Sequence, residues 1–289
     1  MSLSTNSSTL EKPPWIRIKL SQGDVFNSVN DIVNKERLNT VCSSAACPNK
    51  AECWNMGTAT FMILGNLCTR ACRFCNVATA KNPLPVDLDE PQRLLNAVIK
   101  MQLKHVVITS VARDDLSDGG ASQFARVLKI LHENTKVSTE VLVPDFFGNI
   151  EHLKIVIEQK PIVFNHNLET VKRLTPIIRS KAQYQRSLEL LKSAKKLNSS
   201  LIIKSGLMLG LGESDDEIKE AIADLKNYGC EHLTLGQYLQ PSKKHHAVQR
   251  FAPLETFVEL KKFSLNLGFK HVVSGPLVRS SYHAKDGIK

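Results

Sequence analysis

The sequence has few aromatic residues, no long hydrophobic run and no hydrophobic segment at its start. Phe, Trp and Tyr make up 6% of its 289 residues, which is sparse for a surface that stacks nucleic-acid bases. Because no run of about 18 apolar residues is present, we predict no membrane-spanning helix. Residues 1–15 are rich in Ser, Thr and Asn, so we expect no secretory signal peptide. These absences favour a cytoplasmic protein that binds neither membranes nor nucleic acid.

Acidic residues are fewer than basic ones. The chain has 28 Asp and Glu against 38 Lys and Arg, a formal charge of +10. The basic residues are scattered and form only short runs, such as Lys195-Lys196 and Lys243-Lys244. Two interpretations stay open: an ordinary solvated surface, or a charge that steers an acidic protein partner or an anionic cofactor to the chain.

Cysteine is scarce too, with seven in the chain, but six of them lie between positions 42 and 75. They form an upstream triad, C-x4-C-x5-C, and a downstream triad, C-x3-C-x2-C: Cys42, Cys47 and Cys53, then Cys68, Cys72 and Cys75. A structural zinc site closes at four ligands, commonly from cysteine pairs, whereas a [4Fe–4S] cluster takes one ligand per iron. Three cysteines would therefore leave one iron open for chemistry.

Other interpretations of the cysteines are weaker. Disulfides are not expected in a reducing compartment, while a six-cysteine zinc site stays possible. Thiolates are soft ligands that suit iron–sulfur clusters, and these are the favoured interpretation. The seventh cysteine, Cys230, begins an apolar run and is expected to be a small buried residue.

From residue 61 onward, apolar runs alternate with stretches of helical pattern. The runs, predicted to be strands, cover residues 61–67, 105–111, 137–143, 162–164, 201–210, 232–239 and 270–278. The predicted helices cover residues 90–103, 120–133, 149–159, 182–197, 215–228 and 254–267. This alternation predicts an α/β fold with β-α-β crossovers. It fits a partial barrel and a doubly wound sheet equally well.

Two further segments precede this alternation. Residues 24–36 are predicted to form a short amphipathic helix. Residues 41–57 read as a loop, which we expect a bound cluster to order.

Polar residues follow the predicted strands, at the edge where both architectures place their chemistry. The first strand is expected to end at Cys68. The polar segments after the others are residues 109–115, 144–145, 165–167, 204–206 with 210–213, and 237–240. Charged and amide groups at successive strand ends predict a ligand site along this edge.

The downstream triad, with Phe74 before its last cysteine, resembles the radical S-adenosylmethionine (SAM) superfamily. Both triads together resemble the lipoyl synthase family within it. The supporting stretches are ACPN at 46–49, GTATFMILG at 57–65, VPDF at 143–146, NHNLE at 165–169, KSGLM at 204–208, GQYLQP at 236–241 and VRSSYHA at 278–284. The resemblance runs from about residue 41 to residue 284.

This resemblance implies a partial (β/α)6 TIM-like barrel with N- and C-terminal extensions. The expected parts are an N-terminal extension with the upstream cysteines at 1–57, the radical SAM barrel at 58–268 and a C-terminal extension at 269–289.

The resemblance also implies two [4Fe–4S] clusters. The downstream triad would hold the cluster whose open iron binds the amine and carboxylate of SAM. The upstream triad would hold an auxiliary cluster with Ser281 as its fourth ligand.

Several side chains are expected to contact SAM or substrate. Phe74 would pack against adenine. The glycine-rich strand that contains Gly206, Gly210 and Glu213 would also lie near adenine. Asn165 and Arg179 would hold polar groups of SAM or substrate, while His166 is expected to be structural. Gly119 and Gly120 would bring backbone close to the SAM amino group, although they also suit an ordinary turn before a helix.

The implied activity is that of a sulfurtransferase in lipoate biosynthesis. It inserts sulfur at carbons 6 and 8 of a protein-bound octanoyl group, with the auxiliary cluster as sulfur donor. The implied partners are octanoylated lipoyl carrier domains of 2-oxo-acid dehydrogenases or the glycine-cleavage H protein, a reduced electron donor and an iron–sulfur carrier. Two alternatives stay open: a methylthiolating radical SAM enzyme and a non-enzymatic zinc or iron–sulfur protein.

Overall fold

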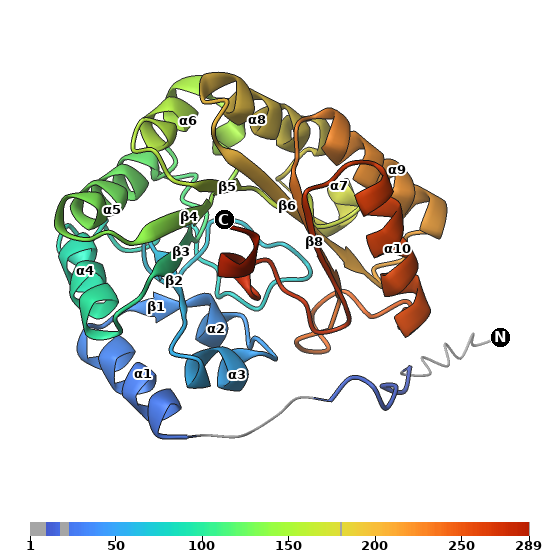
Figure 1. Cartoon of the computed structure of the whole chain (residues 1–289), viewed down its shortest axis with the longest axis horizontal. Coiled ribbons are helices and arrows are strands. Elements are labelled where there is room, and N and C mark those ends of the chain that lie inside the picture. The colour runs from blue at the N-terminus through green and yellow to red at the C-terminus, as the bar shows by residue number, and fades with distance from the viewer. Residues whose placement is uncertain (1–9, 18–22, 180, 289) are drawn as a thin grey trace.

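A computed structural model describes residues 10–17, 23–179 and 181–288 of the chain, and one curved sheet dominates it (Figure 1). Eight strands lie side by side in the order of the sequence. Their bounds are β1 Asn39–Thr40, β2 Thr60–Ile63, β3 His105–Ser110, β4 Ser138–Leu142, β5 Val163–Asn165, β6 Ile202–Leu209, β7 His232–Gln237 and β8 His271–Ser274. β2 to β8 are parallel to one another, and β1 is antiparallel to β2.

Helices cover the outer face of the sheet, and the C-terminal segment lies in the space that the sheet surrounds (Figure 1). The helices are α1 Asp24–Lys35, α2 Val41–Ser44, α3 Lys50–Asn55, α4 Glu90–Lys100, α5 Ala121–Asn134, α6 Ile150–Ile157, α7 Thr175–Ile178, α8 Tyr184–Leu197, α9 Asp215–Asn227 and α10 Leu254–Asn266, with 3-10 turns η1 Phe146–Gly148 and η2 Ala284–Gly287. None of the helices in the described part is long and apolar enough to cross a membrane.

The sequence pattern explains this layering. Every residue of β2 and of β7 is buried, as expected for parallel strands covered on both faces. On α5, Phe124, Val127, Leu128 and Leu131 are buried and share one face at the i, i+3, i+4, i+7 spacing. A buried helix stripe against a buried strand repeats around the sheet and forms one continuous core.

The predicted fold class is confirmed. The strand order follows the sequence, without the reversal of a doubly wound sheet. The six strands β2 to β7 with their helices form the partial barrel, and β8 extends it from the C-terminal part of the chain. The division at residues 57 and 268 stays a prediction, and positions 1–9 and 18–22 of its first part lie outside the described residues.

Two expectations about residues 41–68 were wrong. β2 ends at Ile63 rather than at Cys68, because Leu64 and Gly65 have φ angles of 68° and 90° that break the strand. Residues 41–57 are not a plain loop, since they contain α2 and α3. Trp54 of α3 is 1% exposed and its ring packs 5.2 Å from that of Phe26 on α1, so packing contributes to the order of this segment. That a bound cluster also orders it stays a prediction.

Candidate active site

The downstream triad lies on the loop after β2, beside the carboxyl ends of the barrel strands. Backbone hydrogen bonds tie this loop to segments far along the chain. Thr69 N donates to Ala112 O at 2.9 Å, beyond β3, and Arg73 N donates to Ile178 O at 2.9 Å, in α7. The loop has no regular secondary structure of its own, so these tethers fix where its cysteines lie.

The three downstream thiols are close enough to influence one another. Burial raises the pKa of Cys72 to about 11; Arg179 lowers it, and the thiolate of Cys68 raises it further. Burial, followed by the thiolates of Cys72 and Cys68, raises the pKa of Cys75 to about 12, against a backbone hydrogen bond from Val77 that lowers it. Bound iron reverses this preference, because a metal deprotonates a coordinating thiol.

The upstream triad is carried by two short helices. Cys42 lies on α2, Cys53 on α3, and Cys47 between them, with Cys47 N donating to Cys42 O at 3.2 Å. Burial and the thiolates of Cys42 and Cys47 raise the pKa of Cys53 to about 12. All three thiols are free. After burial, the thiolate of Cys42 raises the pKa of both Cys47 and Cys53, so the three lie near one another.

The donor chemistry of both triads suits [4Fe–4S] clusters. Within the described ranges, no three His, Cys, Asp or Glu side chains converge as ligands of one metal ion. In a [4Fe–4S] cluster each cysteine binds a different iron, so its thiols need only surround a larger group. The all-sulfur donor set of each triad is the one that iron–sulfur clusters prefer.

Ser281 reaches the upstream triad on residues 276–283, which we call the C-terminal strap. Thr60 Oγ1 at the start of β2 donates to Ser281 Oγ at 2.8 Å. Tyr282 Oη donates to Glu52 Oε1 of α3 at 2.8 Å. Burial, Glu52 and Cys53 together raise the pKa of Tyr282 to about 12. The strap therefore brings Ser281 close to α3, the helix that carries Cys53, although 228 positions separate the two residues in the chain.

Glu169 lies between the downstream triad and the strap, and the sequence analysis did not assign it a role. Its pKa is raised by burial and lowered by Arg179, by a hydrogen bond from Asn167 and by Arg279 of the strap. Its own charge raises the pKa of Cys72. Asn167 Nδ2 donates to Glu169 Oε1 at 3.0 Å and to Ser280 Oγ at 2.6 Å. In the sequence, the only hint of a role for Glu169 is that it is the acidic residue of the NHNLE motif.

Asn165 and Arg179 are both buried at the strand ends. Asn165 Nδ2 donates to Glu140 Oε1 at 3.1 Å, while its Oδ1 has no partner in the described part of the chain. Arg179 Nη1 donates to Leu168 O at 3.0 Å, and its charge lowers the pKa of Cys72. Arg179 thus lies near the downstream triad, and Asn165 keeps a free acceptor.

A buried ion pair lies beside Asn165. Lys204 Nζ of β6 lies 2.9 Å from Glu140 Oε1 of β4. The neighbouring Thr139 contacts His132 on the outer helix α5, so Glu140 points to the inner face of the sheet. His166 is hydrogen-bonded at both ring nitrogens, to Val143 O and Ser187 Oγ, which confirms its structural role.

The predicted glycines have clear roles in the fold. Gly120 has φ 91°, and a Cβ there would lie 2.3 Å from Leu64 Cδ1. Gly119 has φ 60°, and Asp118 Oδ1 accepts from Gly120 N at 2.9 Å, which forms the turn before α5. The turn interpretation therefore accounts for both residues, and their contact with SAM stays a prediction.

The glycine-rich strand is equally crowded. A Cβ at Gly206 would lie 2.6 Å from Thr234 Oγ1, and one at Gly210 would lie 2.2 Å from Gln237 Nε2. The buried carboxylate of Glu213 accepts from Gly210 N at 2.6 Å and closes the turn after β6. Phe74 is half-buried against the core. Cys230 is fully buried, as expected.

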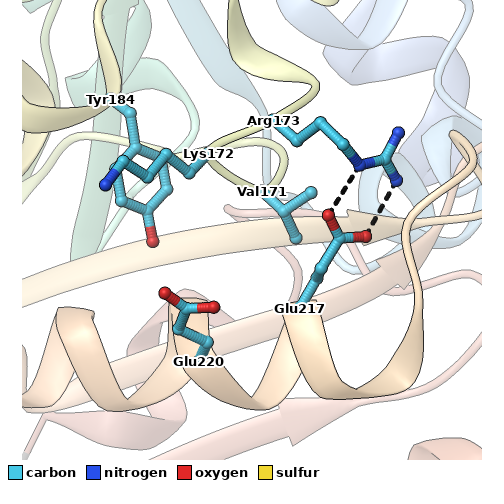
Figure 2. A pocket seen from close by; sticks show the side chains of 6 residues that line it. All are labelled: Val171, Lys172, Arg173, Tyr184, Glu217 and Glu220. Atoms are coloured by element: carbon cyan, nitrogen blue, oxygen red, sulfur yellow. Dashed lines mark hydrogen bonds and ion pairs between the residues drawn. The ribbon is translucent and has the colours of Figure 1, made fainter.

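A surface pocket of about 250 Å³ is separate from this site (Figure 2). It lies between the segment before α7, the start of α8 and α9, and its lining residues are Val171, Lys172, Arg173, Tyr184, Glu217 and Glu220. Arg173 Nε and Glu217 Oε1 pair across it at 2.7 Å. No cysteine of either triad lines it.

The class of protein follows from the barrel, the triad at its mouth and a match to known sequences. Residues 62–225 match the radical SAM superfamily. The chain is a radical SAM enzyme.

Relatives that match over nearly their whole length identify the family within this superfamily. The lipoyl synthase of Caldanaerobacter subterraneus subsp. tengcongensis is 50% identical over 97% of this chain and 98% of its own. The lipoyl synthase of Treponema denticola is 50% identical over 96% and 95%, and that of Chlorobaculum tepidum 47% identical over 97% of each. The chain belongs to the lipoyl synthase family.

Solved structures agree on the fold. A methylornithine synthase has a TM-score of 0.55 at 13% identity, over 86% of this chain and 81% of that one. Streptococcus suis SuiB bound to S-adenosylmethionine has a TM-score of 0.58 at 13% identity, over 78% and 54%. At such low identity these likenesses support the barrel fold alone.

Proposed function

We propose that the protein inserts two sulfur atoms, at carbons 6 and 8, into an octanoyl chain in amide linkage to a carrier-domain lysine. The observation that supports this proposal is that the strap, which carries Ser281, contacts α3 of the upstream region through Tyr282 and Glu52, while Ser281 itself accepts from Thr60. The downstream triad suffices to bind and cleave SAM, so a second set of ligands needs a role of its own. Supply of sulfur is the role that family membership supports.

The residues divide between two cofactors. The downstream triad would hold the cluster that binds SAM, and the upstream triad with Ser281 would hold the auxiliary cluster. When bound, these groups supply a 5′-deoxyadenosyl radical and sulfide. A serine oxygen is a harder and weaker partner for iron than a thiolate, so Ser281 would be a ligand that can leave.

The chain's other polar residues would orient and protect the reactants. Hydrogen abstraction from an alkyl carbon needs no general acid or base. Glu169 and Arg179 lie near the downstream triad, and Asn165 is buried at the end of β5. Their role would be to align SAM with the substrate and to exclude water, with Phe74, Gly119, Gly120, Gly206, Gly210 and Glu213 shaping the surrounding wall.

The reaction implies transient partners in the cytoplasm. The substrate would be presented by a lipoyl carrier domain of a 2-oxo-acid dehydrogenase or by the glycine-cleavage H protein. A reduced protein would supply electrons, and an iron–sulfur carrier would rebuild the auxiliary cluster. The net charge of +10 suits an acidic carrier surface.

The direct test is anaerobic incubation of the reconstituted protein with an octanoylated carrier peptide, SAM and a strong reductant. Mass spectrometry should detect addition of two sulfur atoms, along with 5′-deoxyadenosine. Release of 5′-deoxyadenosine without any sulfur addition would refute the substrate assignment while leaving the radical SAM class intact.

A second measurement isolates the upstream triad. Iron per chain should be about eight in the wild type and about four after Cys42→Ala, Cys47→Ala and Cys53→Ala together, as two four-iron clusters require. About four in both proteins would show that the upstream triad holds no cluster, and the sulfur-donor mechanism would then be abandoned.

A further inference from the structure

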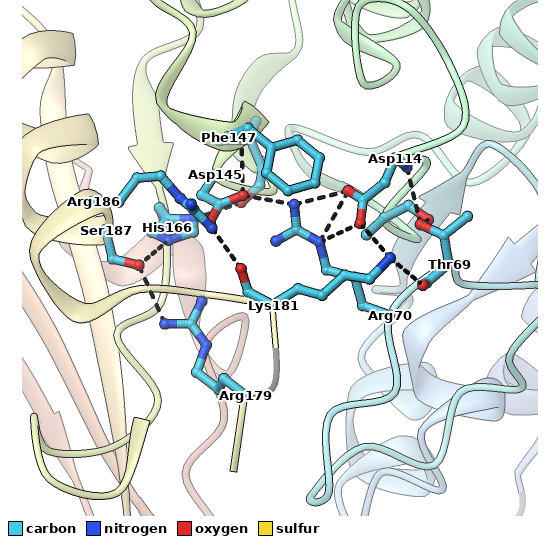
Figure 3. Close-up of polar contacts among 12 residues, drawn as sticks. Thr69, Arg70, Asp114, Asp145, Phe147, His166, Arg179, Lys181, Arg186 and Ser187 are labelled. Carbon is cyan, nitrogen blue, oxygen red and sulfur yellow. Dashed lines mark hydrogen bonds and ion pairs between the residues drawn. The ribbon is translucent and has the colours of Figure 1, made fainter. Parts of the chain in front are cut away.

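Arg70 is a buried charge inside the downstream cysteine loop, between Cys68 and Cys72. Its side chain is 7% exposed. Arg70 Nη2 lies 2.8 Å from Asp114 Oδ1 and 2.7 Å from Asp145 Oδ1. Arg70 Nε also donates to both oxygens of Asp114 at 3.0 Å. One guanidinium therefore joins the loop to two carboxylates (Figure 3).

The two carboxylates come from neighbouring strand ends. Asp114 follows β3 and Asp145 follows β4. Asp145 is 0% exposed and is also bound by Arg186 of α8, whose Nη2 lies 2.7 Å from Asp145 Oδ2. The ring of Phe147 lies 4.9 Å from the Arg70 guanidinium and covers this group (Figure 3). Arg70 thus has a fixed place in the barrel rim.

The charge of Arg70 reaches the cysteines. It lowers the pKa of Cys72, although burial is the larger effect and raises that pKa. Burial alone would raise the pKa of Asp145, but Arg70 and its other cationic neighbours lower it to about 2. Asp145 is therefore ionised at neutral pH, and the negative charges of Asp114 and Asp145 lie against Arg70. Each carboxylate also has a second cation, Lys181 at 3.4 Å from Asp114 and Arg186 at 2.7 Å from Asp145.

We propose that Arg70 is a positioning residue for the downstream triad, and that Asp114 and Asp145 offset its charge so that the iron–sulfur cluster there keeps a low reduction potential. A positive charge near a cluster favours the reduced form, because reduction adds an electron. Splitting SAM needs a strong reductant, so an uncompensated cation at this point would oppose the reaction. The proposal depends on the radical SAM class and not on the auxiliary cluster.

The test compares the wild type with Arg70→Lys, which keeps the charge and loses the forked hydrogen bonds. In the reconstituted protein, SAM changes the electron paramagnetic resonance spectrum of the cluster that it binds. We expect the iron content of Arg70→Lys to equal that of the wild type. The SAM concentration that gives half of the spectral change should rise about tenfold. That factor corresponds to one lost charge-assisted hydrogen bond of about 1.4 kcal/mol.

Arg113→Lys is the matched control. Arg113 is 2% exposed and forms a similar pair with Asp115 at 2.7 Å, but its other bond goes to Leu64 O, directly after β2 and ahead of the segment from Cys68 to Cys75. It should leave the SAM response unchanged. An equal loss in both variants, or a wild-type response in Arg70→Lys, would overturn the positioning role.

Asp145→Asn tests the charge. A redox titration of the SAM-responsive signal should give a less negative midpoint potential, with the other cluster unchanged. Asp114→Asn, at a site 11% exposed, should move the potential in the same direction and provides the test if the buried variant does not fold. An unchanged or more negative potential in the folded variant would overturn the charge compensation. Absence of a second cluster in the wild type would refute the proposed function without touching this result.

Discussion

The two cysteine triads are held by different kinds of contact. Backbone hydrogen bonds tie the downstream loop to the barrel. Arg70 of this loop also pairs with the carboxylates of Asp114 and Asp145, which are buried or nearly buried. The upstream triad lies on short helices, and the strap that carries Ser281 is held mainly by side-chain hydrogen bonds that involve Asn49, Thr60, Asn167 and Tyr282. A buried arginine–carboxylate pair thus fixes the first region, and side-chain hydrogen bonds hold the second. This suits a cluster that survives each cycle and, as proposed, one that gives up its sulfide.

The largest expected effect is that loss of each triad abolishes a different set of products. Cys72→Ala should abolish 5′-deoxyadenosine formation and sulfur insertion, because the cluster that binds SAM is lost. Cys53→Ala should abolish sulfur insertion alone. Chromatography of 5′-deoxyadenosine with mass spectrometry of the peptide separates these results, and loss of 5′-deoxyadenosine in Cys53→Ala would break the comparison.

Trp54→Ala should destabilise the upstream region strongly. Trp54 is 1% exposed and packs α3 against Phe26, and removal of a buried Trp side chain costs about 3–5 kcal/mol. Chemical denaturation measures this loss, with the exposed Trp15→Ala, 41% exposed, as the control. If the cluster-free protein lost nothing, packing would not be what orders residues 41–57.

His166→Gln should flatten the dependence of stability on pH. Burial, with Arg179, lowers the pKa of His166 to about 4, below its unfolded value near 6.5. The neutral ring therefore stabilises the fold fully above pH 6.5, and this stability is lost as the pH falls towards 4. Between pH 7.5 and 5 the loss is about 2 kcal/mol.

Paired denaturation curves at those two pH values test this. Only the difference between wild type and variant is used, so acid loss of a cluster common to both cancels. Equal slopes would show that the fold does not lower the pKa of His166.

Thr60→Val should have the smallest effect and sharpens the comparison most. It removes the hydrogen bond to Ser281 Oγ while keeping the side-chain shape. One such bond of about 1 kcal/mol corresponds to a rate change of about fivefold. We therefore expect a chelator to remove iron from the auxiliary cluster about fivefold faster, with Thr60→Ser restoring the wild-type rate.

Thr109→Val serves as the control, because the Thr109 hydroxyl bonds to Leu142 O on β4, away from the strap. The rate of iron loss from the downstream cluster should be the same in all of these proteins. Faster loss from both clusters would mean a general loosening of the barrel.

Much of the fold was predictable because the apolar runs and helical stripes are long and regular. The alternation of strands and helices from residue 61 gave the correct elements. The end of β2 and the helices α2, α3 and α7 were missed, because they are short and depend on the left-handed Leu64 or on partners such as Phe26. Local sequence says little about a helix of four residues when its stability comes from tertiary packing.

The sequence by itself determined the candidate ligands: six cysteines in two spaced triads, and a Ser-Ser-Tyr motif more than 200 positions further along the chain. Spacing limits which thiols can share one group, so this part of the prediction needs no structure. Only the tertiary structure decided that the strap with Ser281 contacts α3, that Glu169 lies between the two regions, and that Arg70 pairs with Asp114 and Asp145. The reason is that parallel strands bring their carboxyl ends to one rim whatever their separation in sequence.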